Sequence, residues 1–252
     1  MFELVLPQTP EAWLAWSVPL ATLVIGLAYF LTPASVLGHL GLQGSVGEAR
    51  SSFAGFLVGL SLAAILFDQP VLLQQLGLAW AFAAIGKLVH VGLDGARGLS
   101  VMTRLALAAA FAGLACALAG LPDATRLAMP AAVPQMLIAG AGLLTALTGV
   151  LALVAPGLLA GVLNLVPVDG EAATGELRGS HAGFHLAAGL GVLVADGPFT
   201  ELALGACWLL SAFGRMISML SERDRLLFNW AMLVAEIAIG SAVLAVVFGM
   251  VA

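Results

Sequence analysis

The segment EARSSFAGF at residues 48–56 returns 128 positions later as ELRGSHAGF at residues 176–184. The match continues at the same offset in residue types that are scarce in this composition. The further pairs are Asp68 and Asp196, Pro70 and Pro198, Trp80 and Trp208, Gly86 and Gly214, and Lys87 and Arg215. Residues 26–33 and 149–156 also match, at an offset of 123. The sequence therefore predicts an internal duplication.

The composition excludes a soluble globular protein. The 252 residues are 62% hydrophobic and 9% charged, with a mean hydropathy of +1.09. Soluble domains are about 45–50% apolar and about 25% charged. Apolar stretches of about 20 residues mark transmembrane helices. Eight such spans are predicted, at residues 12–31, 51–67, 71–91, 101–121, 133–154, 181–195, 199–219 and 227–250.

The predicted fold is all-α, with eight transmembrane helices arranged as two parallel four-helix repeats. Residues 1–127 form the first repeat and residues 128–252 the second. Because each half holds an even number of spans, both halves have the same orientation, and we expect them to be related by an axis along the membrane normal. A transmembrane β-barrel would require apolar and polar residues to alternate, and residues 105–121 lack that alternation.

The distribution of basic residues predicts the orientation. With eight spans, both termini and the loops after the second, fourth and sixth spans lie on one side, which carries Arg126 alone. The basic residues of the other side are Arg50, Lys87, Arg97, Arg104, Arg178, Arg215, Arg223 and Arg225. Since cytoplasmic loops are enriched in Lys and Arg, we expect both termini on the non-cytoplasmic side.

Small residues four apart predict helix–helix contacts. They are Gly55, Gly59 and Ala63 in the second span and Gly183, Ala187 and Gly191 in the sixth. Such spacing lets backbones approach closely within lipid, so we interpret these residues as packing surfaces. Cys116 and Cys207 lie inside apolar spans and are interpreted as small buried hydrophobic residues.

The chain resembles a family of small bacterial four-helix membrane proteins of unknown function. The resemblance rests on Glu48-Ala49-Arg50 and Glu176-Leu177-Arg178, and on the pairs Gly86-Lys87 and Gly214-Arg215. Lys87 stands where the family pattern suggests an arginine. The resemblance would cover nearly the whole chain as two tandem copies. It implies a four-helix fold and a bacterial inner (plasma) membrane location, and it implies no activity.

Repeated charges form the first candidate site, on the cytoplasmic side. Its residues are Glu48, Arg50, Lys87, Glu176, Arg178 and Arg215. We favour an ion-paired cluster that fixes helix ends at the interface, because each copy includes a carboxylate. The alternative is a binding site for an anionic headgroup or a small anion, since a guanidinium matches phosphate or carboxylate geometry.

The second candidate site consists of polar residues that the first half lacks. Glu236 is about ten residues into the last span, about 15 Å deep, and His181 and His185 are one helical turn apart. Three interpretations stay open. Glu236 is a structural, protonated carboxyl group; or it forms a proton- or cation-responsive site with His185; or all three residues bind a metal ion.

The leading functional hypothesis is a non-enzymatic integral membrane protein, a scaffold or accessory subunit of a membrane complex. The alternatives are a small-solute, ion or proton transporter that uses Glu236 and His185, and a metal-dependent membrane enzyme. Phosphate-loop and nucleophile-elbow motifs do not occur in the sequence. We expect no cofactor and no nucleic acid. The expected partners are the lipid bilayer and either another membrane protein or a second copy of the chain.

Overall fold

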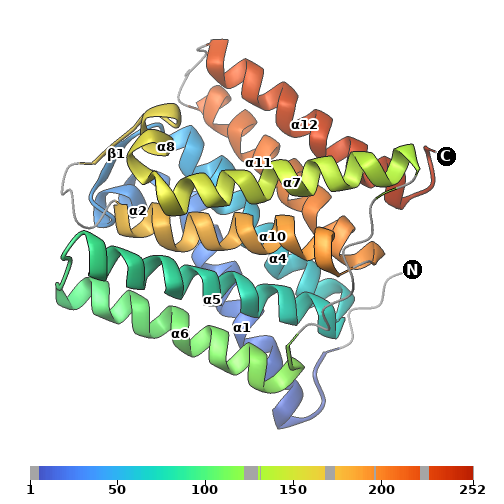
Figure 1. Ribbon diagram of the computed structural model, residues 1–252, viewed down its shortest axis with the longest axis horizontal. Helices are drawn as coiled ribbons and strands as arrows, with labels where there is room; N and C mark the ends of the chain where they lie inside the picture. The colour runs from blue at the N-terminus through green and yellow to red at the C-terminus, as the bar shows by residue number, and fades with distance from the viewer. Residues whose placement is uncertain are drawn as a thin grey trace.

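The computed structural model describes residues 6–121, 130, 132–167, 174–195, 197–221 and 227–251. Asp196, Arg126, Arg223 and Arg225 lie outside this range. The structure is a bundle of helices (Figure 1), which confirms the all-α prediction. The longer helices are α1 (Pro10–Leu31), α4 (Ala54–Phe67), α5 (Pro70–Leu93), α6 (Leu99–Ala119), α7 (Val133–Val154), α10 (Ala182–Val194), α11 (Pro198–Ser221) and α12 (Leu227–Val247).

Among the described residues, seven helices are long and apolar enough to cross a membrane. These are α1, α5, α6, α7, α11, α12 and the continuous helix Val46–Phe67, which includes α3 (Val46–Glu48) and α4. The remaining predicted span coincides with α10, which continues a helical stretch that is described from residue 174. That stretch contains Glu176, Arg178 and two histidines, so it is less apolar than the others.

Proline marks where several helices begin. Pro10, Pro70 and Pro156 each occupy the first turn of a helix, where the missing N–H costs no hydrogen bond. Pro156 begins α8 (Pro156–Val162), just as Pro33 begins α2 (Pro33–His39). Asp68 ends α4 in the left-handed conformation, with φ +46°, which aspartate tolerates better than most residues.

Two π-helical turns lie at positions that correspond in the two halves. They are η1 (Ala49–Phe53) and η2 (Leu177–His181), which are 128 residues apart and lead directly into α4 and α10. Both coincide with the repeated segment that distinguishes this sequence. Because π-turns are rare and occur frequently at functional sites, the side chains around these two turns are candidates for a functional site.

The helices of the two halves are interleaved. α4 packs against α11, and α10 packs against α5, so each central contact joins the first half of the chain to the second. The small-residue prediction is confirmed at these contacts. A Cβ atom on Gly55 would lie 2.6 Å from the backbone nitrogen of Ser211, and a Cβ atom on Gly183 would lie 2.6 Å from that of Ala83. The predicted boundary near residue 127 therefore separates the two repeats in the sequence, but the helices of the two repeats pack together in one bundle.

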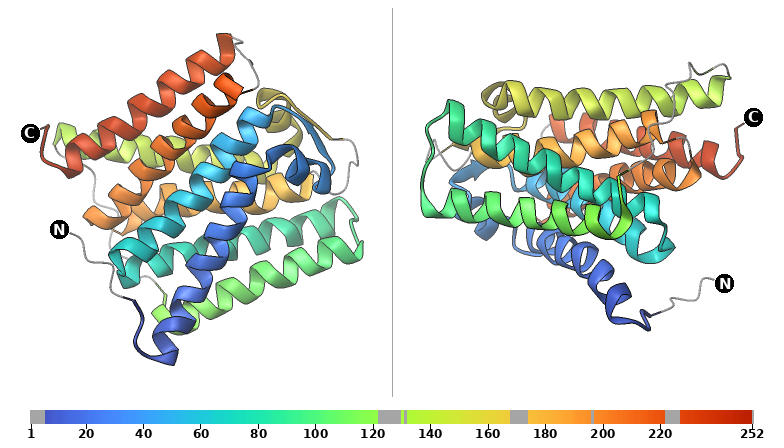
Figure 2. Two further views of the ribbon diagram at one scale, coloured as in Figure 1. Left: turned by 180° about the vertical axis from the view of Figure 1, so that it is seen from behind. Right: turned by 60° about the horizontal axis from the view of Figure 1, so that its bottom comes forward.

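The outer helices also make corresponding contacts. α1 packs on α4, and α7 packs on α10, on opposite faces of the molecule (Figure 2). The indole of Trp80 donates a hydrogen bond to Thr22 in α1, and that of Trp208 donates one to Thr145 in α7, each at 2.9 Å. The same tryptophan–threonine bond thus ties a central helix to an outer helix in both halves.

A short antiparallel ribbon joins the two halves at one end of the bundle. β1 (Leu42–Gly44) pairs with β2 (Leu165–Pro167), with Gln43 opposite Val166. The sequence did not predict these strands, because three residues are too few to show a periodic pattern. Figure 1 shows both ends of the chain on the side of the bundle opposite to this ribbon.

Candidate functional site

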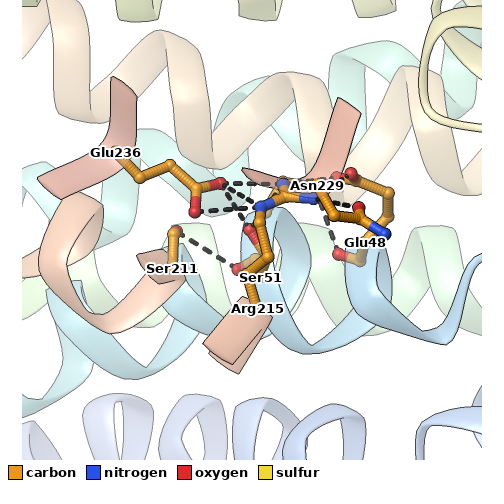
Figure 3. A network of polar contacts seen from close by, with 7 residues as sticks. Glu48, Ser51, Ser211, Arg215, Asn229 and Glu236 are labelled. Atoms are coloured by element: carbon orange, nitrogen blue, oxygen red, sulfur yellow. Dashed lines mark hydrogen bonds and ion pairs between the residues drawn. The ribbon is translucent and has the colours of Figure 1, made fainter. Parts of the chain in front are cut away.

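A buried network of polar contacts is centred on Arg215 of α11 (Figure 3). Glu48 from α3, Ser51 from η1, and Asn229 and Glu236 from α12 surround it. We call these five residues the Arg215 cluster. All of their side chains are buried, and Arg215, Glu48 and Ser51 have no exposed surface.

The guanidinium group of Arg215 binds two carboxylates at once. Its Nη2 group donates to Glu48 Oε2 at 3.1 Å, and its Nη1 group donates to the other oxygen of Glu48. Its Nε and Nη2 groups donate to Glu236 at 3.0 and 2.8 Å. Asn229 and Ser51 accept further bonds at 3.2 and 3.0 Å. All three nitrogen atoms, which carry five N–H donors, are therefore occupied.

Glu236 is held in place from two sides. Besides the bonds from Arg215, Oε1 of Glu236 accepts a hydrogen bond from the Ser51 hydroxyl at 2.7 Å. The backbone carbonyl of Ser51 in turn accepts a bond from the Ser211 hydroxyl at 3.2 Å. Glu236 therefore contacts residues of two segments, η1 and α11, that lie far apart from each other in the sequence. With both carboxylates ionised, the Arg215 cluster would carry one negative charge more than positive.

A simpler ion pair occupies the corresponding place at an offset of 128. Nζ of Lys87 donates to Oε2 of Glu176 at 2.6 Å, and both side chains are buried. Ser180 and Tyr29 donate to the other carboxylate oxygen of Glu176 at 2.5 and 3.5 Å. Ala108 stands where the other half has Glu236. The lysine thus has one carboxylate to bind, whereas Arg215 has two and supplies a larger set of donors.

Both ion pairs join the two halves of the chain. Glu48 of the first half binds Arg215 of the second, and Glu176 of the second half binds Lys87 of the first. The sequence predicted these four charges at the membrane interface, each set within its own repeat. The structure instead buries them between helices contributed by both halves, because α4 packs on α11 and α10 packs on α5.

Arg50 and Arg178, the other two charges of the repeated set, bind the ends of neighbouring helices. Nε of Arg50 donates to the carbonyl of Phe30 near the end of α1 at 2.9 Å. Nη1 of Arg178 donates to the carbonyl of Leu153 near the end of α7 at 3.1 Å. A cation is favourable at a helix C-terminus, where backbone carbonyls lack partners. Each of these two arginines therefore binds the end of an outer helix in its own half of the chain.

His181 and His185 form an aromatic stack. Their ring centroids are 4.1 Å apart, and the rings of Phe53 and Phe56 cover them at 4.8 and 3.8 Å. Both histidines are about 2% exposed. Neither ring is hydrogen-bonded to Glu236 among the described contacts. Within the described residues, no group of three or more His, Cys, Asp or Glu side chains could hold a metal ion.

Sequence reasoning missed Ser51, Ser211, Asn229 and Tyr29 as partners of the buried charges. A signal existed for Asn229, which precedes Glu236 by seven residues and so lies on the same face of the helix. Ser51 lies inside the repeated segment, but its counterpart is Gly179. Because the two copies differ at this position, the repeat gives no indication that Ser51 is a partner of the buried charges.

Two cavities of about 200 Å³ lie among the described residues, and a smaller one of about 10 Å³ is lined by Lys87 and Glu176. Of the two large cavities, one is lined by Trp16, Asp68 and Leu73 among others, and the second by Val71, Gln75 and Phe82 among others. Residues of the Arg215 cluster do not line either large cavity. Glu236 is 1% exposed, so its carboxylate is enclosed by the protein groups that bind it.

Comparison of the chain with family models, with curated proteins and with solved structures found no match. The resemblance to four-helix membrane proteins thus stays a prediction from the motifs of the sequence. The function has to be inferred from the contacts within the chain itself.

Proposed function

We propose that the chain is a non-enzymatic integral membrane protein that acts as a scaffold or accessory subunit of a membrane complex. The observation that supports this most is the saturation of the Arg215 cluster. Every nitrogen of Arg215 is bonded, and Glu236 is bonded to Arg215 and Ser51. A transport or catalytic site needs charged groups that can exchange partners with a substrate, whereas these groups bind each other and join helices from both halves.

The outer surface supports the same proposal. α6 and α12 are candidate membrane spans, and only 17% of the most apolar stretch of each helix is buried inside the bundle. α12 exposes a row of large apolar side chains, which are Leu227, Trp230, Val234 and Ile237. Apolar helix faces of this kind suit contact with lipid tails or with the helix of a partner protein.

We further propose that the chain crosses the membrane eight times as two parallel repeats in a bacterial inner membrane. The corresponding ion pairs, tryptophan–threonine bonds and π-turns support the duplication. The side of the bundle opposite to both chain ends holds the β1–β2 ribbon (Figure 1). The excess of basic residues predicted for that side supports its assignment to the cytoplasm.

Labelling of single cysteines tests this orientation. Gln8 and Ser100 are both exposed and lie on opposite sides under the proposal. In a chain that lacks Cys116 and Cys207, a membrane-impermeant maleimide should label Gln8→Cys in intact spheroplasts. Ser100→Cys should react only after the membrane is permeabilised. The reverse pattern, or labelling of both variants in intact spheroplasts, would refute the orientation.

Photocrosslinking tests the accessory role. A photoreactive amino acid at Trp230 or Val234, both exposed on α12, should give one defined protein adduct in native membranes. The same amino acid at Val243, which is buried on the same helix, should give none. Adducts with lipid alone at every exposed position would count against the scaffold proposal.

The second candidate function is proton or cation transport, which the extra carboxylate of the Arg215 cluster favours. Under the scaffold proposal, reconstituted protein should show no proton or sodium flux that depends on Glu236. The test compares proteoliposomes of the wild-type chain, Glu236→Gln and the control Glu201→Gln, a carboxylate in the first turn of α11. A flux that is abolished by Glu236→Gln and kept by Glu201→Gln would establish transport and overturn the scaffold proposal.

A further inference from the structure

One of the two large cavities lies beside the turn between α4 and α5, on the side of the bundle opposite to the β1–β2 ribbon (Figure 1). Its volume is about 200 Å³. α1, the end of α4, the start of α5 and the end of α6 form its walls, with Pro19, Leu73 and Leu118 among the apolar side chains. Leu118 is exposed and Leu73 is half-buried. The cavity therefore opens at the surface of the bundle.

The carboxylate of Asp68 belongs to the wall of this cavity and is accessible. Asp68 is exposed, and the indole N–H of Trp16, which is itself 7% exposed, donates to its Oδ1 atom at 3.4 Å. In the part of the chain that the structure describes, no basic side chain forms an ion pair with Asp68. The indole thus holds the carboxylate from one side, and a molecule in the cavity can reach it from the other.

The helix ends around the cavity favour a positive charge. α4 ends at Phe67 and α6 ends at Ala119, both beside the cavity. The C-terminal end of a helix carries a partial negative charge. The first turn of α5 also borders the cavity, but it begins with Pro70, which has no N–H group to offer an anion. The local backbone therefore adds to the charge of Asp68.

The distribution of charge over the whole bundle acts in the same direction. The described Lys and Arg residues lie toward the β1–β2 ribbon, and they are Arg50, Lys87, Arg97, Arg104, Arg178 and Arg215. The described acidic residues at the end that holds the cavity are Glu11, Asp68 and Glu201. A surface with charges of one sign attracts ligands of the opposite sign. This end of the bundle therefore favours a cation over an anion.

The chemistry of the wall restricts which cation fits. Calcium and magnesium ions require about six or more oxygen ligands, whereas Asp68 is the single carboxylate among the described lining residues. A cation with a carbon chain can instead use both the carboxylate and the apolar side chains. A protonated primary amine also donates N–H groups, and hydrogen bonds between ionised groups are stronger than neutral ones. A quaternary ammonium group has no such donor.

We propose that this cavity binds a primary alkylammonium group. The ammonium donates a hydrogen bond to the carboxylate of Asp68, and the attached carbon chain lies against Leu73 and Leu118. The headgroup of an aminophospholipid and a free alkylamine both present this group. The site is separate from the Arg215 cluster and does not depend on the scaffold role proposed above.

Two lipids that differ in the methylation of one nitrogen test the proposal. The full chain in detergent is titrated with dioctanoyl phosphatidylethanolamine and with dioctanoyl phosphatidylcholine, and bound lipid is measured by native mass spectrometry. The ethanolamine lipid should bind at least about tenfold more tightly. Asp68→Asn should remove this difference, the effect of losing one charge-assisted hydrogen bond. Asparagine also tolerates the left-handed conformation of residue 68, so the variant should keep the fold.

A titration with octylammonium identifies the source of the group. If the ethanolamine lipid binds and octylammonium does not compete with it, the ligand is a lipid headgroup. If octylammonium binds in a manner that depends on Asp68 and the lipid does not, the ligand is a free amine. Both outcomes retain the ammonium site. Binding of neither probe would overturn it.

Matched variants separate the effect from a general disturbance. Glu201→Gln removes a carboxylate at the same end of the bundle that does not line the cavity, and it should bind like the wild type. Arg126→Gln should do so too; Arg126 lies outside the described residues and is the basic residue predicted for this end. Ala15→Phe fills the cavity, keeps the carboxylate and should abolish the preference for ethanolamine, which provides a second measure if Asp68→Asn does not fold.

Three results would contradict the proposal. They are equal affinities for the two lipids, a preference for ethanolamine that persists in Asp68→Asn and Ala15→Phe, and binding of an ammonium group that appears only in Arg126→Gln. The last result would show that an arginine of the chain occupies the cavity.

Discussion

Replacement of Arg215 by leucine is expected to destabilise the chain more than the loss of any other single charge. The variant would leave Glu48 and Glu236 buried together with no cation between them. Breaking a buried ion pair by removing one partner costs about 3–5 kcal/mol, and here two carboxylates lose their partner. Unfolding in mixed detergent and the yield of monodisperse protein after solubilisation would measure the effect.

Lys87→Leu is the matched comparison and should cost less. It leaves one carboxylate, and Glu176 keeps the hydrogen bonds from Ser180 and Tyr29. Combining Arg215→Leu with Glu48→Gln and Glu236→Gln should recover part of the stability, because no buried charge is then left without a partner. If Arg215→Leu were as stable as the wild type, the Arg215 cluster would not hold the halves together.

The second large effect is expected at Gly86 and Gly214, the glycines that precede the two basic residues. A Cβ atom on Gly86 would overlap the carbonyl oxygen of Arg178, and one on Gly214 would overlap that of Arg50. Both obstacles are backbone atoms, so no side-chain rotation could relieve the overlap. We expect Gly86→Ala to push α5 away from η2 and to cost at least about 1–3 kcal/mol, as overpacking does.

Gly92→Ala is the control for this prediction. Gly92 lies on the same helix, and a Cβ atom there would meet nothing within 4 Å. Since alanine is the better helix former, Gly92→Ala should leave the midpoint of detergent-induced unfolding unchanged or slightly raised. Equal midpoints for Gly86→Ala and Gly92→Ala would show that the close approach of α5 and η2 is not needed.

The sequence predicted the helices well because apolar runs are long and prolines mark their starts. It predicted the candidate charges from their repetition, but it could not tell which of them pair. Lys87 and Arg215 occupy equivalent positions of the two copies. Glu48 could therefore pair with Lys87 of its own copy or with Arg215 of the other copy. The two arrangements produce one and the same repeat pattern. Only the packing of α4 against α11 decides between them.

The burial of Arg215 also could not be predicted from the sequence. Arg215 lies near the end of its predicted span, at residues 199–219, where a long basic side chain can reach the interface. In the structure it has no exposed surface, because α3, η1 and α12 surround it. The carboxylate of Glu236 was recognised as an intramembrane group. Its partner was not, since the two residues belong to different helices and have no fixed spacing in the chain.

The ion pair between Glu48 and Arg215 can form only after the ribosome has synthesised Arg215. The two residues are 167 positions apart in the chain. At a translation rate of about 5–20 residues per second, Arg215 follows Glu48 by about 8–33 s. During that interval Glu48 lacks the guanidinium of Arg215, so we expect that α3 and α4 do not reach their final place when they first enter the bilayer. We expect the first helices to wait near the insertion machinery or the aqueous interface until α11 arrives.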